Sequence, residues 1–356
     1  MATTNITLPV CDESHTPKVS VVIPNWNGLE HLPDCMTALA HQTFRDFQVI
    51  VVDNGSTDHS ITWLERNVPQ ARVVQRADNG GFSAAVNVGI RASESEYVYL
   101  LNNDTVADTE CLSALVAWLD CTDFDVAASK MVFFESPEVV NAAGDTFDMR
   151  HLAGAQRGRG KAVSRYKEPV KVLGACAGAA MYTRSFFDDV GLFDEEFFLV
   201  YEDVDVSLRG LICGKQTVYV PESVVRHKDS ATINRQPLAH IRKLIWRNQF
   251  IVIAKNLPLS LAPLIFVAWC WRMFRDTFPL RPAAWRQIPG LVAQLPEKCA
   301  SQRAGLIIGL SKRADVWRRR TISRRKITRW ILRGTARLHP AEYLTPPATA
   351  DSTCSH

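Results

Sequence analysis

The stretch Tyr97-Val-Tyr-Leu-Leu-Asn-Asn-Asp-Thr105 is an apolar run that ends in three polar side chains, those of Asn102, Asn103 and Asp104. A buried strand that stops on a carboxylate delivers that carboxylate to the edge of a sheet, where ligands bind in open α/β folds. We therefore interpret this stretch as a metal and diphosphate site. A strand that simply leaves its core through an Asn/Asp turn produces the same local pattern, so the interpretation depends on the rest of the chain.

Strand-like and helix-like segments alternate around this stretch. Strands are expected at residues 19–24, 47–52, 72–76 and 97–101, and helices from about residues 29, 61, 81 and 109. This alternation indicates a mostly parallel sheet with helices on both faces. A dinucleotide-binding Rossmann domain is disfavoured, because it requires Gly-x-Gly-x-x-Gly where this chain has Pro24-Asn-Trp-Asn-Gly28.

The segments that follow are less regular. Residues 135–171 are rich in glycine and in basic side chains, and we expect a long surface loop there. Periodicity resumes at residues 172–182, where small side chains allow a close approach to the backbone of a strand. A helix over 201–212 and strands over 217–221 and 224–227 complete the same α/β domain.

Length, composition and cysteine usage describe an ordinary globular protein. The chain has 356 residues, of which 47% are hydrophobic and 22% charged, enough for one large domain with an appendage. Its nine cysteines are scattered, without a Cys-x-x-Cys pair or zinc-finger spacing, which favours a reducing compartment. Residues 1–17 lack the basic start and the apolar core of a signal peptide. We therefore expect a cytoplasmic protein.

The charge is divided unevenly along the chain. Residues 1–237 contain 20 Lys and Arg against 32 Asp and Glu, whereas residues 238–356 contain 21 against 5. The uncharged stretch 257–271 is shorter than the roughly 20 residues that cross a bilayer as a helix. Residues 312–337 combine eleven Lys and Arg with regularly spaced apolar residues, which predicts a basic amphipathic helix on an anionic membrane surface. Nucleic-acid binding would also explain the charge, but the apolar spacing favours lipid.

Several acids and one histidine stand at predicted strand ends or helix starts. They are Asp53, Asp104, Glu202, Asp203, Asp205 and His227. Such a set, without a serine or cysteine nucleophile in a recognisable elbow, suggests metal chemistry with oxygen ligands and general base catalysis. A lone histidine is more often a structural hydrogen-bonding group, and only its place among these acids favours a metal ligand.

Seven motifs in collinear order resemble those of family 2 glycosyltransferases of the GT-A fold. They are Val19-Ser-Val-Val-Ile-Pro-Asn-Trp-Asn-Gly28, Val51-Val-Asp-Asn-Gly-Ser-Thr-Asp58, Asn79-Gly-Gly-Phe82, Leu100-Leu-Asn-Asn-Asp-Thr105, Gly191-Leu-Phe-Asp-Glu-Glu-Phe-Phe198, Tyr201-Glu-Asp-Val-Asp205 and Val225-Arg-His-Lys228. The last three narrow the resemblance to the branch of bacterial rhamnosyltransferases. The match covers residues 18–233, so the implied fold is a mixed, mostly parallel GT-A sheet with helices on both faces.

The resemblance implies a binding site for a nucleotide-diphospho-sugar donor. Asp53 would accept the ring N–H of the pyrimidine base, and the turn Pro24, Asn25, Trp26 and Asn27 would pack beside the base and ribose. The helix start at Asn79, Gly80 and Gly81 suits an anionic diphosphate, and Asn103 belongs to the same donor site. The family's Asp-x-Asp metal motif corresponds to Asn102-Asn103-Asp104, whose first position departs from the pattern. Asp104, His227 and donor phosphates would then hold Mg²⁺ or Mn²⁺, and Asn102 would belong to the same metal site.

The resemblance also implies the roles of the acids near residue 200. Asp203 would be the general base for in-line, inverting attack by an acceptor hydroxyl, and Glu202 would offset the helix N-terminus that lowers the pKa of Asp203. Asp205 is a rival base, and Asp205 and Gly178 are expected beside the acceptor. Arg157 or Arg184 would meet an anionic group, although both fit ordinary surface charges.

These inferences divide the chain and leave several functions open. The divisions are a flexible N-terminus at 1–17, a GT-A domain at 18–237 with a nucleotide-binding half (18–105) and an acceptor half (106–237), a basic helical membrane-associating region at 238–339, and a disordered tail at 340–356.

The favoured function is transfer of L-rhamnose from dTDP-L-rhamnose to a lipid-linked or polymeric glycan on the inner face of the plasma membrane. No nucleic-acid partner is expected, and homo-oligomerisation is left open. The alternatives are a UDP-hexose donor, a nucleotidyltransferase, which lacks its glycine-rich basic loop here, and a carbohydrate-binding protein with a decayed site.

Overall fold

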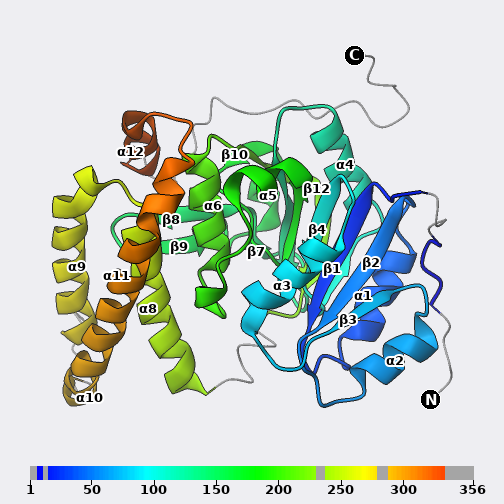
Figure 1. Cartoon of the computed structure of the whole chain (residues 1–356), viewed down its shortest axis with the longest axis horizontal. Helices are drawn as coiled ribbons and strands as arrows, with labels where there is room; N and C mark the ends of the chain where they lie inside the picture. The colour runs from blue at the N-terminus through cyan, green and yellow to red at the C-terminus, as the bar shows by residue number, and fades with distance from the viewer. Residues whose placement is uncertain (1–5, 11–14, 230–236, 279–287, 333–356) are drawn as a thin grey trace.

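The computed structural model describes residues 6–10, 15–229, 237–278 and 288–332. Its centre is a ten-stranded sheet in the order β10-β12-β6-β11-β4-β1-β2-β3, with β5 paired to β12 and β7 to β6 (Figure 1). The strands of this sheet are β1 (Val19–Asn25), β2 (Phe47–Asp53), β3 (Arg72–Gln75), β4 (Tyr97–Leu101), β5 (Thr105–Ala107), β6 (Val126–Phe133), β7 (Val140–Ala142), β10 (Val170–Val172), β11 (Ala179–Thr183) and β12 (Thr217–His227).

The strands of residues 18–105 that pair around β1 form a parallel sheet, as the alternation of segments predicts. β1 pairs in parallel with both β2 and β4, and β2 pairs in parallel with β3. Apart from its proline, every residue of β1 is buried, and all of β4 is buried, because continuous apolar runs suit strands covered on both faces. The parallel strands end at one edge of the sheet, so Asn25, Asp53 and Asn102 lie together there.

Helices cover both faces of the sheet, also as predicted. The helices of this domain are α1 (Leu32–Ala40), α2 (Ser60–Asn67), α3 (Gly81–Ala92), α4 (Cys111–Asp120), α5 (Arg184–Val190) and α6 (Glu202–Ile212). Apolar residues of α1, α2 and α4 form one core with the sheet, while those of α3, α5 and α6 form a second core on its opposite face. The antiparallel pairing of β11 with β4 makes the sheet mixed.

The expectation of a structureless basic loop at residues 135–171 is wrong. This segment contains β7, β10, a short helical turn η1 (Val163–Arg165) and a separate two-stranded sheet of β8 (Asp145–Asp148) and β9 (Ala153–Gln156). Phe147 on β8 is fully buried against residues of α6 and of the C-terminal helices. The many glycines hide this order from the sequence; Gly144, for example, has a φ of +86° and carries the chain into β8.

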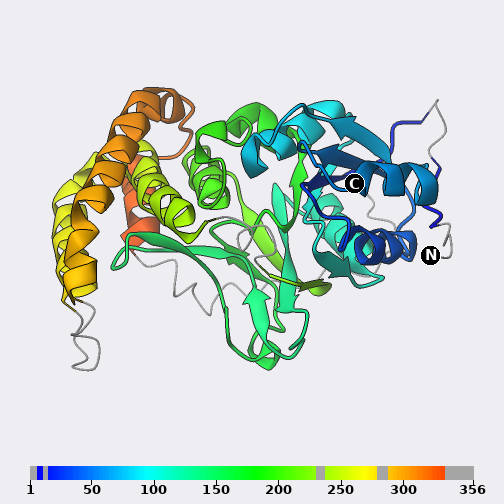
Figure 2. The same ribbon diagram turned by 90° about the horizontal axis from the view of Figure 1, so that it is seen from below.

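The helices α8 (Leu238–Asn256), α9 (Ala262–Thr277), α10 (Ile288–Ala293), α11 (Leu295–Arg318) and α12 (Arg324–Leu332) follow the sheet domain. Figures 1 and 2 show them gathered at the end of the molecule opposite β3. α8 and α11 pack closely because glycines meet the facing backbone: a Cβ on Gly305 would collide with the carbonyl of Arg247, and one on Gly309 would crowd Ile251.

The basic segment 312–337 does not form the single amphipathic helix that its spacing predicts. α11 ends at Arg318 and α12 begins at Arg324, and the residues after 332 lie outside the described part of the chain, as does the tail 340–356. Val316, Ile327 and Ile331 are buried in a core shared with α6 and α8. The apolar stripe therefore packs against the protein itself.

Two further features concern the surroundings of the chain. Within the described residues no single helix is long and apolar enough to cross a membrane, although α8 and the segment 259–277, bent by 120°, pass that test together by length and composition.

The free thiols among the described residues are Cys35, Cys111, Cys176, Cys213, Cys270 and Cys299, whereas Cys121 is disulfide-bonded. The cysteines therefore give no support to the expectation of a reducing compartment.

Candidate active site

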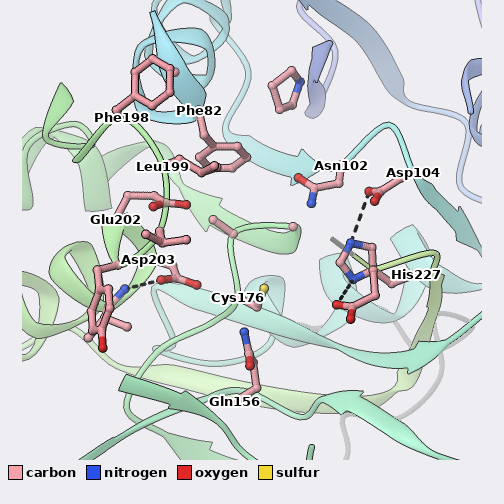
Figure 3. A pocket seen from close by; sticks show the side chains of 18 of the residues that line it. Phe82, Asn102, Asp104, Gln156, Cys176, Phe198, Leu199, Glu202, Asp203 and His227 are labelled. Carbon is pink, nitrogen blue, oxygen red and sulfur yellow. Dashed lines mark hydrogen bonds and ion pairs between the residues drawn. The ribbon is translucent and has the colours of Figure 1, made fainter. Parts of the chain in front are cut away.

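A cavity of about 500 Å³ opens where β1, β4 and β12 end, and most of the predicted site residues line it (Figure 3). They are Pro24, Asn25, Trp26, Asn79, Gly81, Asn102, Asn103, Asp104, Gly178, Glu202, Asp203 and His227. Asn27, Asp53, Gly80 and Asp205 are not among its lining residues. The sheet edge predicted from Tyr97–Thr105 is thus the floor of a cavity.

Asp53 lies beneath the cavity wall, not on its surface. Its carboxylate accepts hydrogen bonds from Asn25 Nδ2 at 3.1 Å and from the Ser56 amide at 3.0 Å. Asn103 Nδ2 in turn donates to Asn25 Oδ1 at 2.8 Å. This chain of bonds ties the ends of β1, β2 and β4 together. Each Asp53 oxygen accepts one of these bonds, so the carboxylate keeps acceptor capacity although it does not line the cavity.

Asn27 also has a structural task. It adopts a φ of +50°, and its Oδ1 accepts from the amides of Thr57 at 2.7 Å and Asp58 at 3.2 Å. The turns after β1 and β2 are thereby fixed to each other. Trp26, between Asn25 and Asn27, remains on the cavity wall, where an aromatic ring can pack beside a base.

The N-terminus of α3 does not offer the free amides that a diphosphate site would use. The amides of Gly80 and Gly81 donate to the side-chain oxygens of Asn54 and Asn79 at 3.2 and 3.0 Å, and the Phe82 amide donates to the Phe198 carbonyl at 2.6 Å. Gly81 has a φ of +84°, and a Cβ there would collide with Phe198. The segment therefore shapes the cavity through its close approach to the chain before α6.

Asp104 and His227 form one side of the cavity. β12 pairs antiparallel with β5 so that His227 stands opposite Thr105, which places His227 Nε2 3.2 Å from Asp104 Oδ1. Burial opposes ionisation of Asp104, but the hydrogen bond and charge of His227 outweigh it, and the pKa of Asp104 is lowered. Asn102 lies beside Gly178, because the backbone amide of Asn102 donates a hydrogen bond to the Gly178 carbonyl at 2.9 Å.

The surroundings of His227 suit a metal ligand. Its Nδ1 faces Asn141 Oδ1 at 3.3 Å and Asp229 Oδ1 at 3.9 Å, the arrangement that fixes a ring so that Nε2 is directed at a metal. No group of three or more His, Cys, Asp and Glu side chains within the described ranges is arranged to hold a metal ion. Asp104 and His227 therefore fit a site that phosphate oxygens of a donor would complete.

Glu202 and Asp203, at the start of α6, form the opposite side of the cavity (Figure 3), which Asp145 of β8 also lines. The chain enters this helix through Phe198, Val200 and Tyr201, which all have positive φ, a costly backbone that is typical of functional sites. Burial and the charge of Asp203 raise the pKa of Glu202 to about 8, and burial raises the pKa of Asp203 to about 6. At neutral pH Glu202 is thus mainly protonated and Asp203 mainly ionised.

Sequence analysis missed Asp145, which lines the cavity from β8. Its side chain is 2% exposed and its Oδ2 has no hydrogen-bond partner, as is also true of Glu202 Oε2. Burial and the charges of Asp203 and Glu202 raise its pKa well above the usual range. The residue was hidden because it lies in the segment expected to be a loop.

Arg159 and Asp229 were also missed as lining residues. Arg159 Nη2 lies 2.7 Å from Asp229 Oδ2, and Asp229 also accepts from Asn141 Nδ2 at 3.1 Å. Arg159 brings a positive charge to the side of Asp104 and His227. Its position among basic residues of the predicted loop was the available signal.

The assignment of Asp205 to the acceptor site, or as a rival base, is wrong. Asp205 is fully buried and its carboxylate is 2.8 Å from Arg209 Nε, 3.0 Å from Lys255 Nζ and 2.8 Å from Asn256 Nδ2. These bonds join α6 to α8, which is a structural role.

Neither of the two candidate arginines reaches the cavity. Arg184 donates to the carbonyls of Ile90 and Ser93, and Arg157 lies over the rings of Tyr166 and Tyr219. The structure therefore gives neither arginine the contact with an anionic substrate group that was the less favoured alternative.

The chain is similar to several known proteins. Residues 20–191 match the family described as Glycosyl transferase family 2. The glycosyltransferase GlyG of Streptococcus pneumoniae is 30% identical over 111 residues, 30% of this chain and 37% of that protein. The N-acetylglucosaminyl-diphospho-decaprenol L-rhamnosyltransferase of Mycobacterium tuberculosis is 26% identical over 255 residues, 64% of this chain and 81% of that protein. The matched region spans only 37% of the length of GlyG. It spans 25% of the length of another relative, the protein y4gI of Sinorhizobium fredii.

The fold has a counterpart among solved structures. The crystal structure of GalNAc-T7 with UDP, GalNAc and Mn²⁺ superposes with a TM-score of 0.56 at 16% identity, covering 83% of this chain and 57% of that one. This likeness confirms the predicted GT-A fold. Residues 20–191 are therefore a family 2 glycosyltransferase domain, and the chain resembles the rhamnosyltransferases of that family.

Proposed function

We propose that the protein is an inverting glycosyltransferase that uses a nucleotide-diphospho-sugar donor and an acceptor hydroxyl. The observation that carries this proposal is the opposition of two unlike groups across one cavity. Asp104 and His227 stand on one side, and Asp203 with Glu202 stands on the other (Figure 3). Asp104 and His227 would hold the charged diphosphate that leaves, and Asp203 would take the proton of the acceptor hydroxyl.

On the first side, Asp104 and His227 would hold Mg²⁺ or Mn²⁺ together with the donor's diphosphate. The cation, when bound, neutralises charge that grows on the leaving diphosphate. Arg159 lines the same side and adds a fixed positive charge. The nucleoside would lie over Pro24, Asn25 and Trp26, with Asn79, Asn102 and Asn103 supplying polar contacts. The roles of Asp53, Asn27 and Gly80 would be to support these residues.

On the second side, Asp203 would accept the proton of the acceptor hydroxyl. Its pKa of about 6 makes it a stronger base than an ordinary aspartate while leaving it ionised at neutral pH. Glu202, with a pKa of about 8, keeps its proton and places no second negative charge beside the base. Attack from this side, opposite the diphosphate, would invert the anomeric carbon. Gly178 leaves room near the reacting groups because it has no side chain.

For the donor we propose dTDP-L-rhamnose, and for the acceptor a lipid-linked or polymeric cell-surface glycan. The name of the mycobacterial relative supports L-rhamnose as the sugar and a lipid-linked acceptor. A UDP-hexose is the alternative donor, supported by the UDP and GalNAc named in the GalNAc-T7 structure. A carbohydrate-binding protein with a decayed site is supported only by the amide of Asn102 in place of a carboxylate.

The deciding experiment is a donor screen with the purified full chain. Thermal shift and donor hydrolysis would be measured with a panel of dTDP- and UDP-sugars, with and without Mn²⁺. We expect metal-dependent stabilisation by pyrimidine nucleotides and hydrolysis of one donor, with dTDP-L-rhamnose leading. Binding without hydrolysis or transfer of any sugar would favour the decayed site.

We further propose that the protein is peripheral on the inner face of the plasma membrane. The excess of Lys and Arg after residue 237 supports this, as do the exposed side chains of Phe266, Val267, Trp271 and Phe274 on α9, which are 52 to 63% exposed. The apolar surface available to lipid lies mainly on α9, with smaller contributions from exposed side chains such as Ile307 of α11 and Leu332 of α12, because Val316, Ile327 and Ile331 are buried.

A further inference from the structure

A second cavity, of about 920 Å³, lies between α11, α12 and the turn that precedes α9. It is lined by Pro258, Leu259, Ser260, Leu310, Arg313, Ala314, Trp317, Arg324, Arg325, Thr328, Arg329 and Leu332. None of these residues belongs to the cavity at the sheet edge. The composition is unusual for a structural cavity, because it combines four arginines with leucine and tryptophan.

The charge of this cavity is uncompensated in the described parts of the chain. Its lining contains four arginines and no Asp or Glu, and none of the four guanidinium groups has an ion pair with a described carboxylate. Burial and then the charge of Arg324 lower the pKa of Arg313. Because like charges repel, a site that gathers four of them is best stabilised by a bound anion.

The guanidinium group of Arg313 is held in place by the protein, and that of Arg324 lies near the same tryptophan ring. Arg313 donates to the carbonyls of Ala254 and Leu257 at 2.7 and 2.8 Å, and lies 4.8 Å from the ring centre of Trp317. Arg324 lies 5.7 Å from the centre of the same ring. Trp317 Nε1 donates to the Lys255 carbonyl at 3.1 Å. A preorganised guanidinium group beside a second one is suited to phosphate oxygens.

The rest of the cavity is apolar and continues onto exposed apolar surface. Leu259, Leu310 and Leu332 are 67%, 49% and 49% exposed. Leu259 belongs to the turn that leads directly into α9, whose outer side chains Phe266, Val267 and Trp271 are also exposed. An occupant would therefore be anionic at one end and apolar at the other.

We propose that this cavity binds the phosphate headgroup of an anionic phospholipid from the bilayer on which α9 rests. Arg313, Arg324, Arg325 and Arg329 would contact the phosphate, and Leu259, Leu310 and Leu332 would contact the acyl chains. The inference rests on the proposed membrane attachment and not on the proposed sugar transfer. It turns a general attraction of basic residues to lipid into a defined site with a stated ligand.

The test is flotation of the full chain with phosphatidylcholine vesicles that contain or lack phosphatidylglycerol. The double variant Arg325→Gln/Arg329→Gln removes two charges that line the cavity. The control Arg318→Gln/Arg320→Gln removes two exposed charges that do not line it, one at the last residue of α11, where it pairs with Asp315, and one just after that helix. Each basic side chain near the surface contributes about fivefold to binding. We expect the cavity variant to lose affinity for phosphatidylglycerol vesicles by at least about thirtyfold, and the control to lose far less.

Three results would overturn the proposal. Equal losses for the two double variants would show diffuse attraction and no site. Equal binding of the wild type to both kinds of vesicle would show that no anionic lipid is recognised. Retained vesicle binding by the cavity variant, with transfer lost only to a lipid-linked acceptor, would assign the cavity to the acceptor. Donor hydrolysis measured in parallel reports on the cavity at the sheet edge, so failure of one proposal is distinguished from failure of the other.

Discussion

His227 Nε2 lies 3.2 Å from Asp104 Oδ1, although 123 positions separate the two residues in the sequence. The pairing of β12 with β5 brings them together, and Asn141 and Asp229 face the other ring nitrogen. A pair of this kind is too small to hold a divalent cation tightly by itself. It explains why we expect metal binding and donor binding to depend on each other.

The first prediction concerns this pair. Asp104→Asn should weaken nucleotide binding in the presence of Mn²⁺ by about ten- to a hundredfold, because it removes the charged ligand, and should change metal-free binding little. Titration calorimetry with and without EDTA measures this difference. Asp108→Asn is the matched control, since Asp108 is an exposed partner of Arg226 near the same strand. Equal losses with and without metal would argue against the metal role.

The second prediction separates Asp203 from Glu202. Asp203→Asn should lower the transfer rate by about 10² to 10⁴, the usual contribution of a general base, while leaving donor binding intact. Glu202→Gln should keep the rate within a few-fold at neutral pH, because a pKa of about 8 means that the native side chain is already protonated. Steady-state rates with saturating donor measure both. Near-normal turnover of Asp203→Asn would disprove the base assignment.

The third prediction is a pH dependence of stability. Glu202 and Asp203 have folded pKa values of about 8 and about 6, above the usual values near 4. The folded state therefore binds protons more tightly than the unfolded chain, so stability should fall as pH rises from about 4 through about 8. Urea unfolding across this range measures the slope. Glu202→Gln should flatten its upper part, and an unchanged slope in that variant would contradict the assignment.

The fourth prediction concerns the role of Asp205. Because Asp205 compensates Arg209 and Lys255 in the interior, Asp205→Ala should lower the free energy of unfolding by about 3 to 5 kcal/mol. A thermal or urea unfolding curve gives the value. Asp188→Ala, which removes an exposed carboxylate from α5, should change it little. A stable Asp205→Ala variant with no activity would return Asp205 to the list of catalytic candidates.

Much of the fold could be predicted because its signals are local. Buried strands such as β1 and β4 are continuous apolar runs, and their polar ends fall at one sheet edge by the geometry of parallel strands. The meeting of Asp104 with His227 was predicted only through resemblance, since no local pattern encodes the pairing of β5 with β12.

The remaining errors concern which surface a side chain meets. Asp203 and Asp205 are two residues apart in one acidic run, yet one lines the cavity and the other is buried by Lys255 from α8. Likewise, the spacing of Val316, Ile327 and Ile331 shows an apolar face but does not say whether lipid or the protein covers it. Such choices are decided by tertiary contacts.

The central claim is that attack begins at Asp203, on the side of the cavity opposite Asp104 and His227. The most direct test is to determine by NMR the anomeric configuration of the product formed from the donor that the screen identifies. The geometry predicts a configuration opposite to that of the donor. A product with retained configuration would contradict the account, because it would place the attacking oxygen and the leaving diphosphate on the same side.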